Sequence, residues 1–418
     1  MKVHIIGSGI IGLFSAYYLV KDGYEVEIID QSDGGEGCST QNAGMIVPSH
    51  FVPLAAPGMV FKAMKWMLDS TSPFYAKPRL NLDFLNWAIK FALSANQKKA
   101  EAAMPVLQES LWNSKMLYEE IEDLEIDFEK KGLLMLCQTD HMLENEISVG
   151  QKAQELGMKA SILDRGGVHQ LEYESKPDVR GGVFYPDDAH CNPQKLMGSL
   201  KSFLKANGVV FSYNSVLTKV QFSNDKIGSI SIDRKDQGIL DIKVDELVLA
   251  TGSWSGQLAK MLKLNMPIEA GKGYSFMEQQ TRNKRIFHPA ILCEAKVAVT
   301  PFQDNSVRFA GTMEFSGIND RIERKRVEAI VEAGRRFYTE SDIRSPNDDD
   351  IWHGLRPCSP DGLPYIGRSS QIGNLTIATG HAMLGISMGT GTGKRVSEII
   401  RNKEIGQASD LFNPNRFG

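Results

Sequence analysis

The sequence predicts a protein of the α/β plus α+β class, in which a parallel sheet assembled from separate segments joins a β-rich part with helical insertions. Two observations predict this class. Short apolar runs end in glycine turns at three distant places, residues 7–12, 250–252 and 378–380. Because such runs suit strands buried on both faces of a parallel sheet, they indicate one sheet built from three segments. Residues 268–315 between them have the composition of further strands.

The first 30 residues contain the pattern of a dinucleotide-binding unit. An apolar run leads into Gly7-Ser8-Gly9-Ile10-Ile11-Gly12, and a helical stretch and a second apolar run follow, up to Asp30. Gly7 allows the tight turn, Gly9 the approach of a pyrophosphate, and Gly12 the packing of the helix on the strand. The helix N-terminus offers N–H groups and partial positive charge to phosphates, and Asp30 can accept hydrogen bonds from a ribose. The sequence therefore predicts a Rossmann-like domain.

A signal peptide is the alternative interpretation of this segment, because Lys2 precedes an apolar stretch. The glycine spacing, Asp22, the acidic strand end at Asp30 and the lack of a small-residue cleavage site oppose it.

The bulk properties narrow the class of protein. A chain of 418 residues suggests two domains, and 42% hydrophobic with 23% charged residues is typical of a soluble globular enzyme. The net charge of −4 gives no reason to expect nucleic-acid binding. The five cysteines are scattered and include no C-x-x-C pair, so they indicate neither a metal site nor a disulfide framework. Their pattern predicts a cytoplasmic location. No apolar run approaches the ~18 residues of a membrane span.

The remaining elements follow in order along the chain. Residues 60–125 have mostly helical periodicity, with apolar positions such as Leu85, Trp87 and Phe91. A helix is expected at 193–206, with Asn192 as its N-cap and Gly208 as its stop. Further strands are expected at 132–137, 181–186, 209–213, 217–222, 227–233, 240–244, 245–250 and 375–379, and further helices at 141–157, 322–338 and from about 380 to 400.

Several motifs resemble one family over nearly the whole chain. They are Cys38-Ser39-Thr40-Gln41-Asn42-Ala43-Gly44, Leu54-Ala55-Ala56-Pro57-Gly58, Lys65-Trp66-Met67, Lys272-Gly273-Tyr274-Ser275, Gly354-Leu355-Arg356-Pro357, Pro360-Asp361-Gly362-Leu363-Pro364-Tyr365-Ile366-Gly367 and Thr379-Gly380-His381-Ala382-Met383-Leu384-Gly385. The chain resembles FAD-dependent amine oxidoreductases of the D-amino-acid oxidase, glycine oxidase and sarcosine oxidase superfamily, and looks most like bacterial D-amino-acid dehydrogenases. An acid at position 30 suits NAD or FAD, and the C-terminal return to the first sheet favours FAD.

The resemblance implies how the chain is divided and where FAD binds. Residues 1–48, 192–262 and 346–418 are expected to form the FAD-binding domain, and residues 49–191 and 263–345 the substrate-binding domain. The expected cofactor-binding residues are Gly7, Gly9, Ile10, Ile11, Gly12, Asp30, Gln31, Ser39, Thr40, Asn42, Ala43, Gly44, Ala250, Thr251, Gly252, Gly380, His381, Met383, Leu384, Gly385 and Ile386.

Two positions depart from the family pattern. Asp30 is one methylene shorter than the glutamate common in such flavoproteins. The flavin-linking cysteine of sarcosine oxidases corresponds to Gly354, so we expect Cys358 to be an ordinary small residue and FAD to be non-covalent.

The C-terminal segment allows two interpretations. A helix beginning near Gly380 could aim its dipole at the N1/C2=O edge of the flavin and stabilise the reduced anion. The glycines at 385, 389, 391 and 393 would then let the backbone approach the ring. A glycine-rich helix packed under the sheet is the other interpretation.

Arg356, His381 and Tyr274 are the candidate catalytic residues. The rigid fork of an arginine matches a carboxylate bidentately, and the resemblance implies that Arg356 holds the substrate carboxylate over the flavin. His381 could lie at the flavin edge or cap its helix. Tyr274 could close over the substrate, or fill the core as tyrosines in strands commonly do. His50 and Lys272 are candidates by neighbourhood.

The resemblance implies oxidation of a D-amino acid to an imino acid, then to a 2-oxo acid and ammonia, by hydride transfer to flavin N5. Electrons would pass to a quinone-type acceptor. Three alternatives remain: a D-proline or hydroxy-D-proline dehydrogenase, a glycine/sarcosine-type oxidase using O2, and a non-catalytic flavin-binding sensor. An amphipathic basic patch at residues 61–68 could bring the protein to the inner face of the membrane, or could pack on its own domain.

Overall fold

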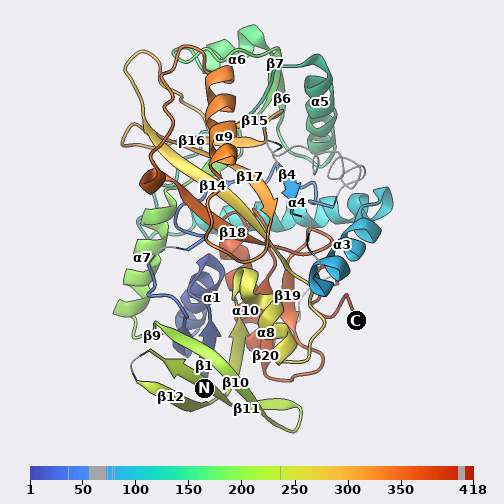
Figure 1. Ribbon diagram of the computed structural model, residues 1–418, viewed down its shortest axis with the longest axis vertical. Helices are drawn as coiled ribbons and strands as arrows, with labels where there is room; N and C mark the ends of the chain where they lie inside the picture. Colours follow the sequence, from blue (N-terminus) through green and yellow to red (C-terminus); the bar gives the residue numbers. More distant parts are fainter. Residues whose placement is uncertain are drawn as a thin grey trace.

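The computed structural model describes residues 1–35, 37–55, 72, 74–77, 79, 81–235, 237–402 and 410–418. Two sheets organise these residues. Figure 1 shows the smaller one in the lower part of the molecule, with the N-terminus, and the larger one in the upper part. The predicted patch at residues 61–68 lies outside the described residues. No described helix is long and apolar enough to cross a membrane.

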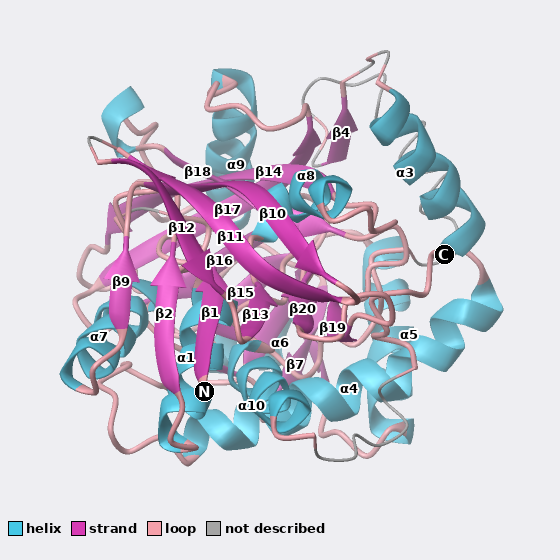
Figure 2. Cartoon of the chain, turned by 90° about the horizontal axis from the view of Figure 1, so that it is seen from below, coloured by secondary structure: helices cyan, strands magenta, loops and turns pink. Residues whose placement is uncertain are grey.

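The lower sheet confirms the prediction of one sheet from separate segments. In the described chain its strands run β19 (Tyr365–Arg368), β20 (Leu375–Thr379), β13 (Glu246–Leu249), β1 (Lys2–Ile6), β2 (Glu25–Ile29) and β9 (Val210–Ser212), and Figure 2 shows them side by side. Parallel pairing places Ile6 beside Leu249, and Leu249 beside Ile377. The glycine turns after β1, β13 and β20 therefore meet at one edge.

Both faces of the lower sheet are covered. On one face Val3 and Ile5 pack in a cluster with side chains of α1 (Ile10–Lys21), α7 (Pro193–Ala206) and α10 (Gly389–Ile400). On the other face Ile6 packs with a small antiparallel sheet, β10 (Ser215–Ser223), β11 (Lys226–Arg234) and β12 (Gly238–Lys243), and with α8 (Ser255–Met261). Burial on both faces explains why these strands are apolar at nearly every position.

The upper sheet is mixed, and it carries the helical insertions. Within the described residues its order is β18 (Trp352–Cys358), β14 (Glu269–Gln279), β17 (Ser306–Phe315), β16 (Val297–Pro301), β15 (Ala290–Leu292), β5 (Leu133–Cys137), β7 (Gly181–Tyr185) and β6 (Ser161–Asp164), with β4 (Phe74–Ala76) beside β17. The associated helices are α3 (Leu82–Ser94), α4 (Gln97–Glu119), α5 (Asp140–Glu155), α6 (Arg165–Leu171) and α9 (Arg324–Phe337). A short pair, β3 (Met45–Ile46) and β8 (Ala189–His190), links the two parts. This architecture confirms the predicted fold class.

Most predicted elements are present, and α7 has the predicted cap: Oδ1 of Asn192 accepts from the N–H groups of Gln194 and Lys195. The predicted start of the last helix is wrong. Gly380 and Ala382 have φ angles of +81° and +48°, so residues 380–388 form turns and α10 begins at Gly389.

The placement of β18 bears on the predicted domain limits. This strand falls in the segment 346–418 that was expected in the FAD-binding domain, yet it pairs with β14 in the upper sheet. The domain limits themselves stay a prediction.

Candidate active site

A cavity of about 810 Å³ lies where the parallel strands end and reaches up to the larger sheet. The glycine turns of β1, β13 and β20 form one part of its wall, and residues 351–357 on and beside β18 form another. Ligands of open α/β sheets bind at the carboxyl ends of the strands, so this is the expected place for a dinucleotide.

The first glycine turn is shaped by backbone contacts. A Cβ at Gly7, whose φ is +108°, would lie 2.4 Å from the carbonyl oxygen of Ala250, and a Cβ at Gly12 would lie 2.0 Å from that of Gly7. Gly9 differs, because a Cβ there would meet only Oγ of Ser39, at 3.5 Å. Gly9 precedes α1 and has no side chain to cap it, and the N–H of Ile10 donates to Oγ of Ser39 at 3.0 Å. Both Gly9 and Ile10 line the cavity, so the positive end of the helix lies at its wall. The turn fits a pyrophosphate.

Asp30 lines the cavity and is held by two serines. Its Oδ2 accepts from the N–H (2.6 Å) and hydroxyl (2.7 Å) of Ser8, and its Oδ1 from the N–H (2.8 Å) and hydroxyl (2.7 Å) of Ser32. The two N–H groups fix the carboxylate in the turn. The two hydroxyls are free to rotate, so the hydroxyls of a ribose can replace them as donors.

The structure brings most of the predicted cofactor-binding residues to the cavity. Those that line it are Gly7, Gly9, Ile10, Ile11, Asp30, Gln31, Ser39, Thr40, Asn42, Ala250, Thr251, Gly252, His381, Met383, Gly385 and Ile386. Those that do not are Gly12, Ala43, Gly44, Gly380 and Leu384. Of these, Leu384 is buried in an apolar cluster, and a Cβ at Gly44 would lie 2.2 Å from the carbonyl oxygen of Cys191.

The glycines of α10 pack against other helices. A Cβ at Gly393 would lie 2.5 Å from the backbone carbonyl of Phe14 on α1, and a Cβ at Gly389 2.9 Å from the ring of Phe14. A Cβ at Gly391 would lie 3.1 Å from Ser114 on α4. Only Gly385, of the four glycines in this run, lines the cavity. The interpretation that the whole run approaches a flavin ring is therefore wrong for the three glycines inside α10, which follow the packing interpretation.

Arg356 lies on β18 with its guanidinium in the cavity wall. Its Nη1 donates to the carbonyl oxygen of Thr312 at 2.6 Å. Burial lowers the pKa of Arg356, and the ionisable groups facing it within the described chain are the thiols of Cys38 and Cys358, which are not carboxylates. An arginine remains protonated in proteins, so this half-buried cation has no ion-pair partner among the described acids.

His381 is buried, and its Nε2 lies 3.0 Å from Oγ1 of Thr392 on α10. It also lines the cavity. Burial lowers the pKa of His381 to about 3, so the imidazole is neutral at physiological pH. The neutral imidazole can donate a hydrogen bond to a ligand or accept one from it, but it has no charge with which to hold a carboxylate.

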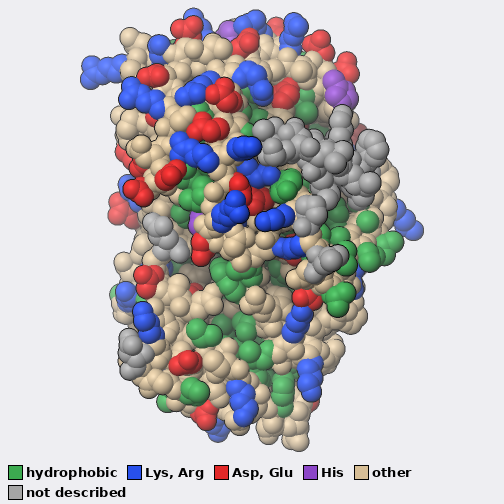
Figure 3. Space-filling model, in the orientation of Figure 1, with side chains coloured by type: hydrophobic (Ala, Val, Ile, Leu, Met, Phe, Trp, Pro, Cys, Tyr) green, Lys and Arg blue, Asp and Glu red, His purple; other side chains and the backbone are tan. Residues whose placement is uncertain are grey.

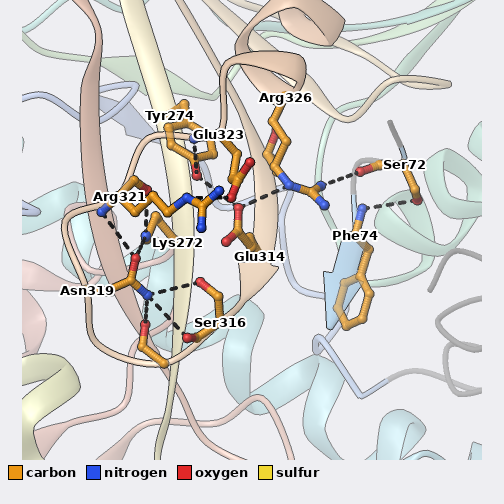
Figure 4. A network of polar contacts seen from close by, with 12 residues as sticks. Ser72, Phe74, Lys272, Tyr274, Glu314, Ser316, Asn319, Arg321, Glu323 and Arg326 are labelled. Carbon is orange, nitrogen blue, oxygen red and sulfur yellow. Dashed lines mark hydrogen bonds and ion pairs between the residues drawn. The ribbon is translucent and has the colours of Figure 1, made fainter. Parts of the chain in front are cut away.

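The structure does not bring Tyr274 to the cavity wall. Tyr274 lies on β14, 1% exposed, and its hydroxyl donates to Oε2 of Glu314 at 2.9 Å. Glu314 in turn pairs with the buried Arg326, at 3.0 Å. Lys272, two residues away on the same strand, is also buried and also off the cavity (Figure 4). This arrangement corresponds to the core-filling interpretation of Tyr274.

Sequence reasoning missed several cavity residues. Lys201 reaches it from α7, Trp254 and Gln257 from the segment after β13, and Asp320 and Ile322 from the loop between β17 and α9. These positions carry no motif. Only the tertiary arrangement of loops distant in sequence brings them together.

A glycine-lined helix N-terminus, an acid in the same cavity wall and a half-buried cation on a neighbouring sheet are the features expected of a dinucleotide-binding protein. The sequence pattern of the DAO family, described as "FAD dependent oxidoreductase", matches residues 2–399. The chain belongs to this family, and FAD is its cofactor.

Named relatives agree with this assignment. The chain is 32% identical to a D-amino acid dehydrogenase of Vibrio atlanticus, covering 98% of this chain and 97% of the relative. Its fold resembles glycine oxidase from Geobacillus kaustophilus (TM-score 0.75, 18% identity, 99% and 98% coverage) and L-proline dehydrogenase from P. horikoshii (TM-score 0.71, 18% identity, 100% and 97% coverage).

Proposed function

We propose that this protein is a dehydrogenase that oxidises D-amino acids to imino acids, which hydrolyse to 2-oxo acids and ammonia. The observation that carries the proposal is the half-buried guanidinium of Arg356, which lines the cavity and faces no described carboxylate. A charge partly removed from water is stabilised by a counterion, and the carboxylate of an amino acid would supply one. The neutral His381 nearby would leave the charge balance of that pair undisturbed.

Bound FAD supplies the two-electron oxidation. The protein then has to bind and orient the substrate, and a bidentate Arg356 does both by fixing the carboxylate and so the direction of the Cα–H bond. The fold does not determine the configuration of the substrate, because an L-proline dehydrogenase has a similar fold. The D configuration is supported instead by the names of relatives at about 30% identity.

An anaerobic panel of D- and L-amino acids, glycine and N-methyl amino acids tests the proposal, with flavin absorbance as the readout. We expect several D-amino acids to bleach the flavin, and Arg356→Met to keep its FAD while losing bleaching at the same concentrations. Bleaching by D-proline and hydroxy-D-proline alone would favour a D-proline or hydroxy-D-proline dehydrogenase. Fast reoxidation in air with peroxide release would favour an oxidase, and a flavin that no amine reduces would favour a sensor.

We further propose a quinone-type acceptor reached at a membrane surface. Helix α3 supports a membrane contact, because apolar side chains at helical spacing are exposed on its outer face: Leu82, Leu85, Ile89 and Leu93. Figure 3 shows hydrophobic side chains gathered over this helix at the right of the view. Lys98 and Lys99 follow at the start of α4. We expect sedimentation with anionic vesicles, weaker for Ile89→Ser; equal sedimentation of both proteins would contradict this surface.

A further inference from the structure

Lys272 is a buried lysine whose ammonium group donates hydrogen bonds to one loop. It lies on β14 with no exposed surface, and its Nζ donates to Oδ1 of Asn319 and, at 2.9 Å, to the carbonyl oxygen of Arg321 (Figure 4). Burying an ammonium group costs free energy unless its hydrogen bonds are replaced. An apolar side chain would fill this strand position at a lower cost in free energy. The hydrogen bonds that Lys272 makes to the loop therefore give a reason for a lysine at this position.

The loop it holds is residues 316–323, between β17 and α9. Asn319 organises it from inside: its amide donates to the carbonyl oxygens of Ser316 (3.2 Å) and Gly317 (3.1 Å), and its Oδ1 accepts from the N–H of Arg321 (3.2 Å). Lys272 bonds to the same Oδ1 and so fixes the middle of the loop to β14.

Tyr274 fixes the far end of the loop. Its hydroxyl accepts from the N–H of Glu323 at 3.3 Å while donating to Glu314, whose carboxylate is paired with Arg326 of α9. Lys272 and Tyr274 are two residues apart on one strand, so they point to the same face of β14. Together they attach the loop at two points.

The loop residues alternate between the anchor and the cavity. Arg321 and Glu323 bond to β14 through their backbones, whereas Asp320 and Ile322 line the cavity. Asp320 also lies 3.5 Å from Nε2 of His353, a cavity residue on β18, three residues before Arg356. The loop therefore forms part of the cavity wall.

We propose that Lys272 is a positioning residue that holds loop 316–323 in place as part of the cavity wall. The inference rests on the proposed function for the identity of the substrate. Lys272 touches neither substrate nor cavity; it acts through the backbone of Arg321 and the side chain of Asn319, which set where Asp320 and Ile322 stand.

Lys272→Met tests the role, because methionine keeps the length of the side chain and removes the donors. Lys115→Met is the matched control, since Lys115 is also buried and paired, to Glu119 within α4, away from the cavity. The first readout needs no substrate. The side chain of Arg321 is 71% exposed, and its carbonyl is one of the two acceptors of Lys272, so trypsin should cut after Arg321 roughly tenfold faster in Lys272→Met.

The second readout is kinetic, with the best substrate of the anaerobic panel. We expect KM to rise roughly tenfold in Lys272→Met, with kcat within about threefold of the wild type and FAD content unchanged. Asn319→Ala removes one of the two acceptors without changing the strand. It should also speed cleavage after Arg321, and the double variant should be no faster than Lys272→Met.

Equal cleavage rates in Lys272→Met and Lys115→Met would overturn the anchor. Faster cleavage with unchanged KM and kcat would overturn the positioning role. A wild-type flavin that no D-amino acid reduces would defeat the proposed function, while faster cleavage in Lys272→Met would still support the anchor.

Discussion

The guanidinium of Arg356 lies across the backbone of Gly273. A Cβ at Gly273 would stand 2.2 Å from Nη1 and 2.5 Å from Nη2 of Arg356. The two residues sit on neighbouring strands, β14 and β18, where Gly273 pairs with Gly354. A Cβ at Gly354 would collide with the ring of Trp352, 2.2 Å away. The cation therefore reaches the cavity over a part of the sheet that has no side chains.

Gly273→Ala should displace the Arg356 guanidinium while leaving the flavin bound. Displacing a positioning group by about 1 Å can cost about 100-fold in rate, so we expect kcat/KM to fall by roughly 10- to 100-fold. Steady-state kinetics and the flavin content of the purified variant measure the two effects. Gly198→Ala on α7, where a Cβ meets no atom within 4 Å, is the control. Unchanged kinetics in Gly273→Ala would mean that Arg356 does not work from this position.

Asp30→Asn should weaken FAD binding without unfolding the turn. The asparagine keeps one acceptor, but it loses the charge that strengthens hydrogen bonds from a ribose. A hydrogen bond to a charged group contributes about 1.5–3 kcal/mol, so the Kd of FAD should rise roughly 10- to 100-fold. Titration of the apoprotein with FAD measures it. Asp304→Asn is the control, because Asp304 also accepts from the N–H and hydroxyl of a serine, Ser306, and neither residue lines the cavity. Equal affinities would remove Asp30 from the ribose site.

The sequence was sufficient wherever a local pattern determines structure. Apolar strands such as residues 3–6 and 246–249 are apolar because they are buried on both faces. The tight turn itself requires the positive φ of Gly7, and Gly12 is required by its contact with Gly7 in the same turn. The start of α10 could not be predicted in this way. Nothing in its composition marks Ala382 as left-handed; its N–H donates to the carbonyl oxygen of Pro357, so β18 determines that turn.

The anchor of loop 316–323 was beyond sequence reasoning for the same reason. Lys272 and Asn319 are 47 residues apart, and neither belongs to a pattern that requires the other. Arg356 could be found because it lies within a recognisable motif. Its lack of a carboxylate partner, on which the proposed function depends, appears only in the structure.

Gly393→Ala should destabilise the protein although alanine favours helices over glycine by about 1 kcal/mol. The added Cβ would overlap the backbone of Phe14, 2.5 Å away, and overpacking costs about 1–3 kcal/mol. Gly198→Ala, also inside a helix but with open space, should leave stability unchanged or raise it. Thermal unfolding at saturating FAD measures both. A Gly393→Ala protein as stable as the wild type would contradict the close packing of α1 and α10.

Asp188→Asn should remove one component of the pH dependence of stability. Asp188 has no exposed surface; its carboxylate accepts from the hydroxyl of Ser49 and, at 3.2 Å, from the N–H of Ser49. Burial raises the pKa of Asp188 to about 7, although the two hydrogen bonds from Ser49 and, less strongly, the charge of Lys115 oppose the rise.

The sign of the effect follows from the two protonation states. Between about pH 4 and pH 7 the unfolded chain has lost this proton and the folded protein keeps it, so the contribution of Asp188 to stability is full below pH 4 and falls as the pH rises to 7. Each pKa unit is worth about 1.4 kcal/mol, which limits the loss to a few kcal/mol. Urea unfolding of both proteins from pH 4 to pH 8 measures this loss.

Because burial also lowers the pKa of the neighbouring His50 to about 4, the relevant quantity is the difference in the free energy of unfolding between the two proteins. The asparagine can keep both hydrogen bonds to Ser49, so the variant should gain stability relative to wild type as the pH rises; a constant difference would show that Asp188 ionises normally in the folded protein.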